Sequence, residues 1–150
     1  MIDLQEKDLL HQILVGAAPS LTNLIIHAVL LAVVVRTVRD LSARGQAAPA
    51  ILTDTLIIVA TGVLLVTGHF LEVLIWAGTY ALVGAAPPGT ELVYFAFSNY
   101  TTLGYGDVLP VPGWRLLAPM TALNGVLLIG WSTALIFAIL SRSVAAWRQH

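Results

Sequence analysis

Long apolar stretches alternate with short polar ones along this chain of 150 residues. Residues 9–35 and 116–141 contain no Asp, Glu, Lys or Arg, so the two charge-free windows have lengths of 27 and 26 residues. Each window exceeds the roughly 20 residues that a helix needs to cross about 30 Å of hydrocarbon. A third apolar stretch, residues 51–83, carries only Asp54 and Glu72 as charged side chains. The pattern predicts an all-α membrane protein with three transmembrane helices.

Proline and glycine residues that interrupt helices divide the chain further. We expect an amphipathic segment on the outer surface over residues 1–18 and an additional transmembrane helix over residues 19–44, opened by Pro19. Residues 50–150 would follow as one membrane-embedded unit. Its outer helix, 51–83, stops at the Gly- and Pro-rich sequence GAAPPG, and its inner helix covers residues 114–146.

Basic residues indicate how the spans are oriented. Five of the seven Lys and Arg residues lie in two regions: the C-terminal tail, and the first loop between spans, expected at residues 45–49, with its flanks. They are Arg36, Arg39, Arg44, Arg142 and Arg148. The positive-inside rule places both regions in the cytoplasm and the N-terminus outside, which for a bacterial protein means the inner (plasma) membrane. Arg36 and Arg39 are too few for a voltage-sensing ladder and are typical of an anchor at the cytoplasmic face.

Composition agrees with a membrane protein and excludes some chemistry. Hydrophobic residues make up 58% of the chain and charged residues 10%, against about 25% charged in soluble domains. The chain has no Cys, which excludes disulfides, thiolate metal sites and cysteine nucleophiles. The net charge of −1 indicates no class of partner.

A half-length helix is predicted between the outer and inner helices. Residues 90–101 are apolar and aromatic enough for about three helical turns, which span only ~18 Å. Because polar LGYGD follows, we expect this pore helix to re-enter the membrane, where non-helical backbone survives only if it is buried or lines a water-filled path.

The polar stretch after the pore helix suits a cation. Several oxygen ligands must replace the water around a hard cation, and successive backbone carbonyls facing one axis can supply them. Gly104 and Gly106 flank Tyr105 and permit the unusual dihedral angles, while Thr102 adds a hydroxyl oxygen. One chain offers one carbonyl at each level, so a complete cage requires several chains. The C-terminal end of the pore helix adds partial negative charge.

The seven residues Thr101 to Asp107, TTLGYGD, resemble the filter of the potassium channel superfamily. The resemblance extends to the aromatic pair Tyr94 and Phe95 and to Gly125 in the inner helix, and it covers about residues 55–146.

The resemblance implies a homotetramer in the lipid bilayer that conducts K⁺ passively, with no cofactor beyond the permeant K⁺, no catalytic residue, no enzymatic activity and no nucleic-acid partner. Residues 50–150 would be the pore domain, and its selectivity filter would cover residues 102–106. Its K⁺ ligands would be the carbonyls of Thr102, Leu103, Gly104 and Tyr105. Gly106 would permit the turn at the outer mouth, and Gly125 would be the gating hinge or permit close helix packing. The filter would be supported by Thr101, Asp107, Tyr94, Phe95 and Ser98, where Ser98 replaces an acidic residue of some relatives.

Three other functions are compatible with parts of the sequence. Leu103 replaces the usual Val or Ile, which allows a weakly selective monovalent cation channel, and a non-conducting membrane scaffold subunit belongs to a different class. GYGD also fits the GxGD signature of intramembrane aspartyl proteases, which need a second aspartate nearby. Asp54 is the candidate, but it lies at the cytoplasmic start of its span and Asp107 outside.

Ionisable residues inside the spans are suspected of function. His69 and Glu72 share one helix face at i and i+3, and as two ligands they are too few for a zinc site from one chain. We expect both to hydrogen-bond inward to the pore helix or the inner helix, with Asn124 or Ser98 as candidate partners, and a modulatory role in gating is the sharper hypothesis. His27 is interpreted as a satisfied polar residue between helices.

Overall fold

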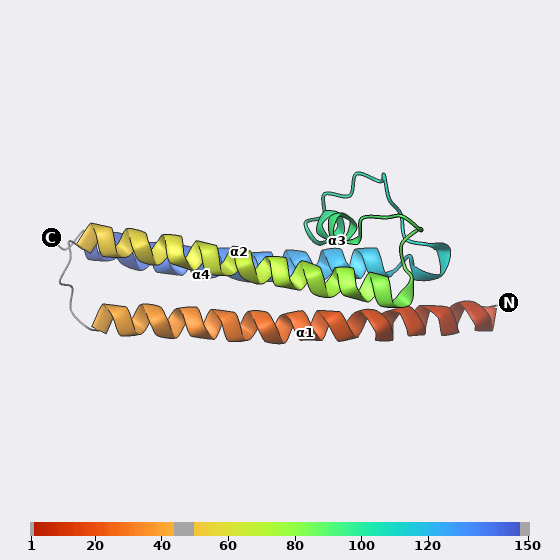
Figure 1. The fold of residues 1–150 in the computed structure, drawn as a ribbon. Helices are drawn as coiled ribbons and strands as arrows, with labels where there is room; N and C mark the ends of the chain where they lie inside the picture. Colours follow the sequence, from red (N-terminus) through yellow and green to blue (C-terminus); the bar gives the residue numbers. More distant parts are fainter. Residues whose placement is uncertain (1, 44–49, 148–150) are drawn as a thin grey trace.

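Helices make up nearly the whole structure, a computed structural model that describes residues 2–43 and 50–147. Three helices are long: α1 (Ile2–Ala43), α2 (Ala50–Val83) and α4 (Leu117–Trp147). They contact one another and run along one common direction (Figure 1). No strand occurs in the two described ranges. The loop expected at residues 45–49, together with Arg44 and Arg148, lies outside them.

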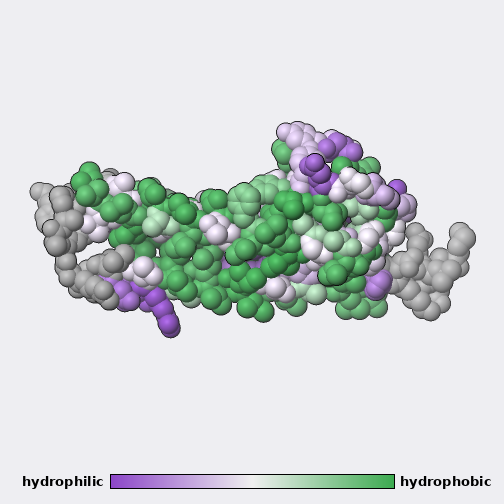
Figure 2. Space-filling view, viewed as in Figure 1, coloured by the Kyte–Doolittle hydropathy of each residue, from purple (hydrophilic) through white to green (hydrophobic). Residues whose placement is uncertain are grey.

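Each long helix carries a stretch that can cross a membrane. These stretches are Leu9–Asp40, Ile51–Val83 and Pro112–Arg142, each of more than 30 residues. At ~1.5 Å per residue they are longer than the ~30 Å hydrocarbon core, so the helices tilt or extend beyond it. Hydrophobic residues cover most of the length of the bundle, and strongly hydrophilic ones gather toward its ends (Figure 2). The expected all-α membrane fold with three spans is confirmed.

The first helix differs from the expectation, because it continues through Pro19 without a break. Residues 2–18 therefore belong to the same helix as the first span and do not form a separate surface helix. Proline removes the backbone donor that would otherwise bond the Val15 carbonyl, four residues earlier, yet the helix continues. Just after Pro19, two hydroxyls add bonds to the helix backbone: the Ser20 hydroxyl donates to the Gly16 carbonyl at 2.8 Å, and the Thr22 hydroxyl donates to the Ala18 carbonyl at 2.9 Å.

A glycine cap ends α2 at the predicted break. Gly84 has φ +64°, the left-handed conformation that glycine adopts at little cost. Its N–H donates to the Ala81 carbonyl at 3.4 Å, and the N–H of Ala85 donates to the Tyr80 carbonyl at 3.0 Å. This is the Schellman pattern, which satisfies carbonyls at the end of a helix. The chain is thereby turned back toward the bundle.

A short helix follows, α3 (Leu92–Tyr100), and then a single 3-10 turn, η1 (Pro112–Trp114), that leads into α4. With nine residues, α3 is shorter than the expected 90–101 and spans only ~14 Å. It lies at the same end of the bundle as the start of α1, beside α2 and α4 (Figure 1). Aromatic side chains fill the space between these three elements: Trp76, Tyr80, Phe95 and Tyr100 are all buried.

Candidate functional site

The filter segment, defined here as residues 102–106, begins where α3 unwinds. The Ser98 carbonyl accepts two hydrogen bonds from it, one from the amide of Leu103 at 2.9 Å and one from the amide of Gly104 at 3.3 Å. A carbonyl oxygen has two lone pairs, so both bonds can form at once. The first half of the segment is therefore tied to the last turn of α3, and its backbone cannot move independently of that helix.

Backbone handedness alternates along the filter segment. Thr102, Gly104 and Gly106 have φ values of +61°, +50° and +78°, whereas Leu103 and Tyr105 between them have negative φ. Thr102 is the single non-glycine residue with positive φ in the described ranges. Left-handed backbone is strained for a residue with a side chain, and such strain is found mainly at functional sites. Alternating handedness turns successive peptide groups the same way, so that amides face one side and carbonyls the other.

The filter segment is uncovered in a single chain. Tyr105 is 69% exposed and Leu103 is 54% exposed, and every residue of the segment belongs to the exposed class. Unpaired backbone carbonyls are costly in an apolar environment unless they meet a donor or a cation. A row of carbonyls of this kind can coordinate a hard, partly dehydrated cation.

A side-chain bond closes the far end of the filter segment. The Tyr94 hydroxyl, on the first turn of α3, donates to Asp107 Oδ2 at 2.8 Å. Acceptance by the carboxylate raises the pKa of Tyr94, because the protonated phenol is the form that donates. The filter segment is thus held to α3 at both ends, at its start through Ser98 and just beyond its end through Tyr94.

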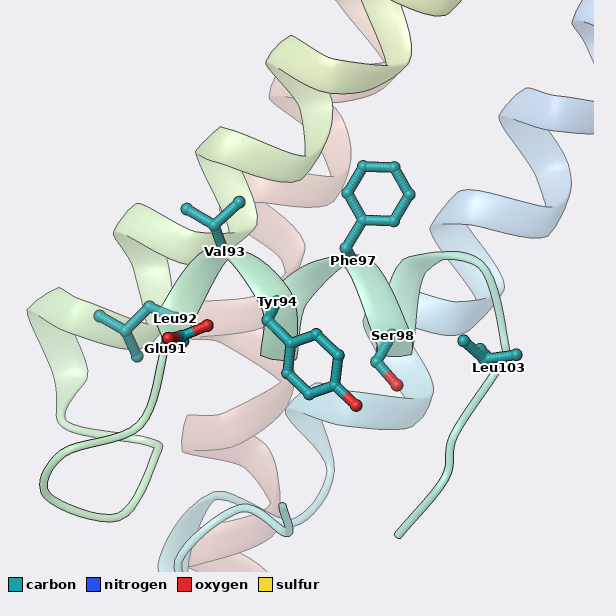
Figure 3. A pocket seen from close by; sticks show the side chains of 7 residues that line it. All are labelled: Glu91, Leu92, Val93, Tyr94, Phe97, Ser98 and Leu103. Atoms are coloured by element: carbon teal, nitrogen blue, oxygen red, sulfur yellow. The ribbon is translucent and has the colours of Figure 1, made fainter. Parts of the chain in front are cut away.

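Phe95, the second residue of the aromatic pair, faces the opposite way from Tyr94. It is buried and packs on Tyr80 of α2, with ring centroids 4.9 Å apart. On the uncovered side of α3 the structure has an open hollow of about 600 Å³. Seven residues line it (Figure 3): Glu91, Leu92, Val93, Tyr94, Phe97, Ser98 and Leu103.

Gly125 is the point of closest approach between α4 and the end of α3. A methyl group at Gly125 would overlap the carbonyl oxygen of Tyr100 and lie 2.8 Å from its carbonyl carbon and 3.0 Å from its ring carbon Cγ. Of the two interpretations of Gly125, close packing is therefore visible in the contacts. The hinge interpretation stays a prediction.

A polar cluster lies inside the bundle, behind the filter segment. We define the buried polar cluster as His27 of α1, His69 and Glu72 of α2, Tyr100 of α3 and Ser132 of α4. Glu72 is 0% exposed, and its two carboxylate oxygens lie 2.8 Å from His27 Nδ1 and 2.9 Å from His69 Nδ1. The Tyr100 hydroxyl also donates to Glu72. Ser132 Oγ lies 3.0 Å from Nε2 of His69 and 3.3 Å from Nε2 of His27.

A second polar group lies nearby on α1, α2 and α4. The Asn124 side-chain oxygen accepts hydrogen bonds from Trp76 Nε1 and from Asn23 Nδ2, each at 3.0 Å. Asn23 Nδ2 also lies 3.1 Å from the Glu72 backbone carbonyl. Both groups therefore connect the additional helix α1 to the two helices of the pore domain.

His69 and Glu72 hydrogen-bond to the pore helix and the inner helix, as expected, but through other residues than Asn124 or Ser98. Their partners there are Tyr100 of α3 and Ser132 of α4, and Glu72 also contacts His27 of α1. The sequence did not place a second histidine, His27, at this site. Asn23 and His27, at i and i+4 in a charge-free span, are the signal that could have indicated it. The role of His69 and Glu72 in gating stays a prediction.

The protease alternative does not fit the structure. Asp54 lies near the start of α2, whereas Asp107 follows α3, which packs at the other end of α2 (Figure 1). Two carboxylates so placed cannot share a proton.

Comparison with known proteins defines the class. The model of an ion channel family matches residues 68–142, half of the chain, which includes the end of α2, α3, the filter segment and most of α4. The chain belongs to this ion channel family, the two-transmembrane type that includes pore domains of potassium channels. Searches of curated proteins and of solved structures found no match.

Proposed function

We propose that the chain forms a passive, potassium-selective channel as a homotetramer. The observation that carries the proposal is the alternation of φ at Thr102, Gly104 and Gly106, in a segment held at both ends to a half-length helix. Such a backbone presents a row of carbonyls, and rings of backbone carbonyls can replace the hydration shell of K⁺. No step of this function requires a catalytic residue or a cofactor, so we infer that the protein is not an enzyme.

Four residues would provide the ligands. The carbonyls of Thr102, Leu103, Gly104 and Tyr105 would each contribute one oxygen to a level of the filter, with the Thr102 hydroxyl at the inner end. Gly106 would form the turn at the outer mouth. Because one chain gives one oxygen per level, a complete coordination shell needs further copies around an axis.

Exposed surface supports an assembly of several chains. Leu103 and Tyr105 are more than half exposed in one chain, and Leu103 also lines the hollow beside α3. A second copy placed against α3 would bury both the hollow and these side chains. Four copies are the number that the resemblance to potassium channels implies.

Orientation follows from the charges. We infer that the N-terminus of α1 and the filter segment face the outside of a bacterial plasma membrane, since the basic residues concentrate at the opposite end. The chain has no cysteine, so a single cysteine introduced at Pro88, an exposed position in the loop before α3, can be labelled alone by an impermeant reagent. Labelling from the outside of intact cells is the expected result.

Flux through purified protein in liposomes tests the function. Liposomes loaded with K⁺ should lose it down its gradient when the protein is present. A Gly104→Ala variant, which places a side chain at φ +50°, should abolish this flux. Gly113→Ala, at a site with nothing within 4 Å and negative φ, is the matched control and should conduct normally. Absence of flux from the unmodified protein would favour the scaffold subunit.

Leu103 gives the weakly selective channel as the second candidate. Its γ-branched side chain differs in shape from the Val or Ile of relatives, and in one chain it is only half covered. Looser packing behind the carbonyls would allow the filter to adapt to Na⁺ as well as K⁺.

A further inference from the structure

We propose that His27, His69 and Glu72 form a binding site for one divalent transition-metal ion of the zinc class. The site would fasten α1 to the pore domain. It does not rest on the proposed conduction of K⁺, because it uses different residues and is tested by binding alone.

Three ligand-type side chains already converge there. One donor atom from each of His27, His69 and Glu72 lies within 4.8 Å of the other two. The two imidazole rings have centroids 5.2 Å apart and both contact the carboxylate. Two imidazoles and a carboxylate form a common ligand set for zinc, which leaves a fourth position for a hydroxyl group or water. Only His69 and Glu72 are close in sequence; the third ligand, His27, lies on α1, 42 residues before His69.

Counting hydrogens indicates that the buried polar cluster lacks a cation. Four contacts form a closed ring, from Glu72 to His27, to Ser132, to His69 and back to Glu72. With an ionised carboxylate and neutral imidazoles, the ring has three hydrogens for these four contacts, one from each histidine and one from the serine. The Tyr100 hydroxyl adds one hydrogen and two contacts, because it donates to Glu72 and its oxygen lies 2.9 Å from His69 Nδ1. Four hydrogens then serve six contacts, so not all of the contacts are filled, and the cluster has a net charge of −1.

No basic side chain is available to balance this charge. Both ion pairs recorded for Glu72 are with the two histidines. Between Asp8 and Arg36, between residues 50 and 83, and between Arg115 and Arg142 the sequence has no Lys or Arg. Glu72 and His27 are both 0% exposed, and an unbalanced buried carboxylate is costly. The missing cation must come from outside the helices.

A metal ion fits this requirement better than an additional proton. A proton would complete the ring of hydrogen bonds, but a metal would use the lone pairs of both imidazoles and the charge of the carboxylate together. The surrounding hydroxyls can orient these ligands, as outer-shell partners do in metal sites: Tyr100 holds the carboxylate and Ser132 lies between the two rings. His69 is 19% exposed, so the chain does not fully enclose the cluster on this side.

The position of the site gives it a structural consequence. Glu72 contacts Tyr100, the last residue of α3, and the Tyr100 backbone packs against Gly125 of α4. An ion at His27, His69 and Glu72 would therefore join the additional helix to the end of the pore helix.

Metal binding to the full chain in detergent tests the proposal, after removal of any polyhistidine tag and treatment with a chelator. We expect one Zn²⁺ per chain after equilibrium dialysis. Co²⁺ in its place should give the intense visible absorption of a four-coordinate site, a measurement that needs no variant. His27→Ala and His69→Ala should each weaken binding at least tenfold. His11→Ala is the matched control, since His11 lies at the Trp114 ring outside the site, and it should bind normally.

Two results would overturn the proposal. One is an unmodified protein that binds no Zn²⁺ or Co²⁺ at micromolar free metal, which would mean that a proton supplies the missing charge. The other is unchanged binding in the His27 and His69 variants, which would place any bound metal elsewhere. Neither result depends on whether the protein conducts K⁺, so failure of this site and failure of the proposed channel remain distinguishable.

Discussion

Replacing Gly125 by alanine should separate the end of α3 from α4. The added methyl carbon would lie 2.8 Å from the carbonyl carbon of Tyr100 and closer still to its oxygen. Carbon atoms in good contact are about 3.5–4.0 Å apart, so the two backbones must move apart by roughly 1 Å. The obstacle is backbone, so no side-chain rotation can relieve the overlap.

The free-energy cost can be estimated from this overlap. Overpacking a well-packed core costs about 1–3 kcal/mol, and a backbone obstacle belongs at the upper end. Alanine is favoured over glycine in a helix by about 0.8–1.0 kcal/mol, which offsets part of that cost. A net destabilisation of about 1–2 kcal/mol is therefore expected for Gly125→Ala, together with a displaced filter segment.

Gly130→Ala is the matched control for this substitution. Gly130 lies on the same helix, five residues later, with nothing within 4 Å of the position of an added methyl group. The free energy of unfolding in detergent, measured by denaturant titration, should fall for Gly125→Ala and stay equal or rise for Gly130→Ala. K⁺ flux should fall only in the first variant. Equal stability and flux in the two variants would refute the close approach of α4 to Tyr100.

Three further predictions concern the filter segment and the contact between helices. Tyr94→Phe removes the hydrogen bond to Asp107 and should make K⁺ currents decay faster than in the unmodified protein. Because this bond raises the pKa of Tyr94, the difference in decay should persist from neutral pH up to about pH 10 and disappear as the pH rises through the raised pKa. A difference that disappears near neutral pH would contradict this role of the hydrogen bond. Leu103→Val should raise the K⁺/Na⁺ permeability ratio measured from reversal potentials, and a lower ratio would contradict the packing argument. Gly68→Ala should leave α1 in place, because the added methyl group would meet only Cδ2 of Leu30, the end of a flexible side chain that can turn aside; protease cleavage of α1 should match that of Gly62→Ala, which meets nothing, and faster cleavage would contradict this.

Local patterns made most of the fold predictable. The charge-free windows and the Pro-Gly break located the second and third spans and the short helix to within a few residues, because span length and helix termination depend on nearby sequence. They did not show that the first helix begins at Ile2. The filter segment was predictable for the same reason, since Gly104 and Gly106 are needed where the backbone is left-handed.

Other features depend on contacts that sequence spacing does not reveal. Pro19 is compatible with a continuous helix, with Ser20 and Thr22 hydroxyls bonded to carbonyls one turn earlier. The buried polar cluster combines residues from four helices, and His27 is 45 positions from its partner Glu72. Its membership in the cluster follows only from how α1 packs against α2.

The reversal potential of the reconstituted channel tests the central claim most directly. Purified protein in a planar bilayer would separate a K⁺ solution from a Na⁺ solution of equal concentration, and the current would be recorded as a function of voltage. Backbone carbonyls that select K⁺ predict a reversal potential strongly displaced toward the K⁺ equilibrium potential, and no current from Gly104→Ala. A current that reverses near zero would contradict potassium selectivity, and no current under any voltage would contradict the channel itself.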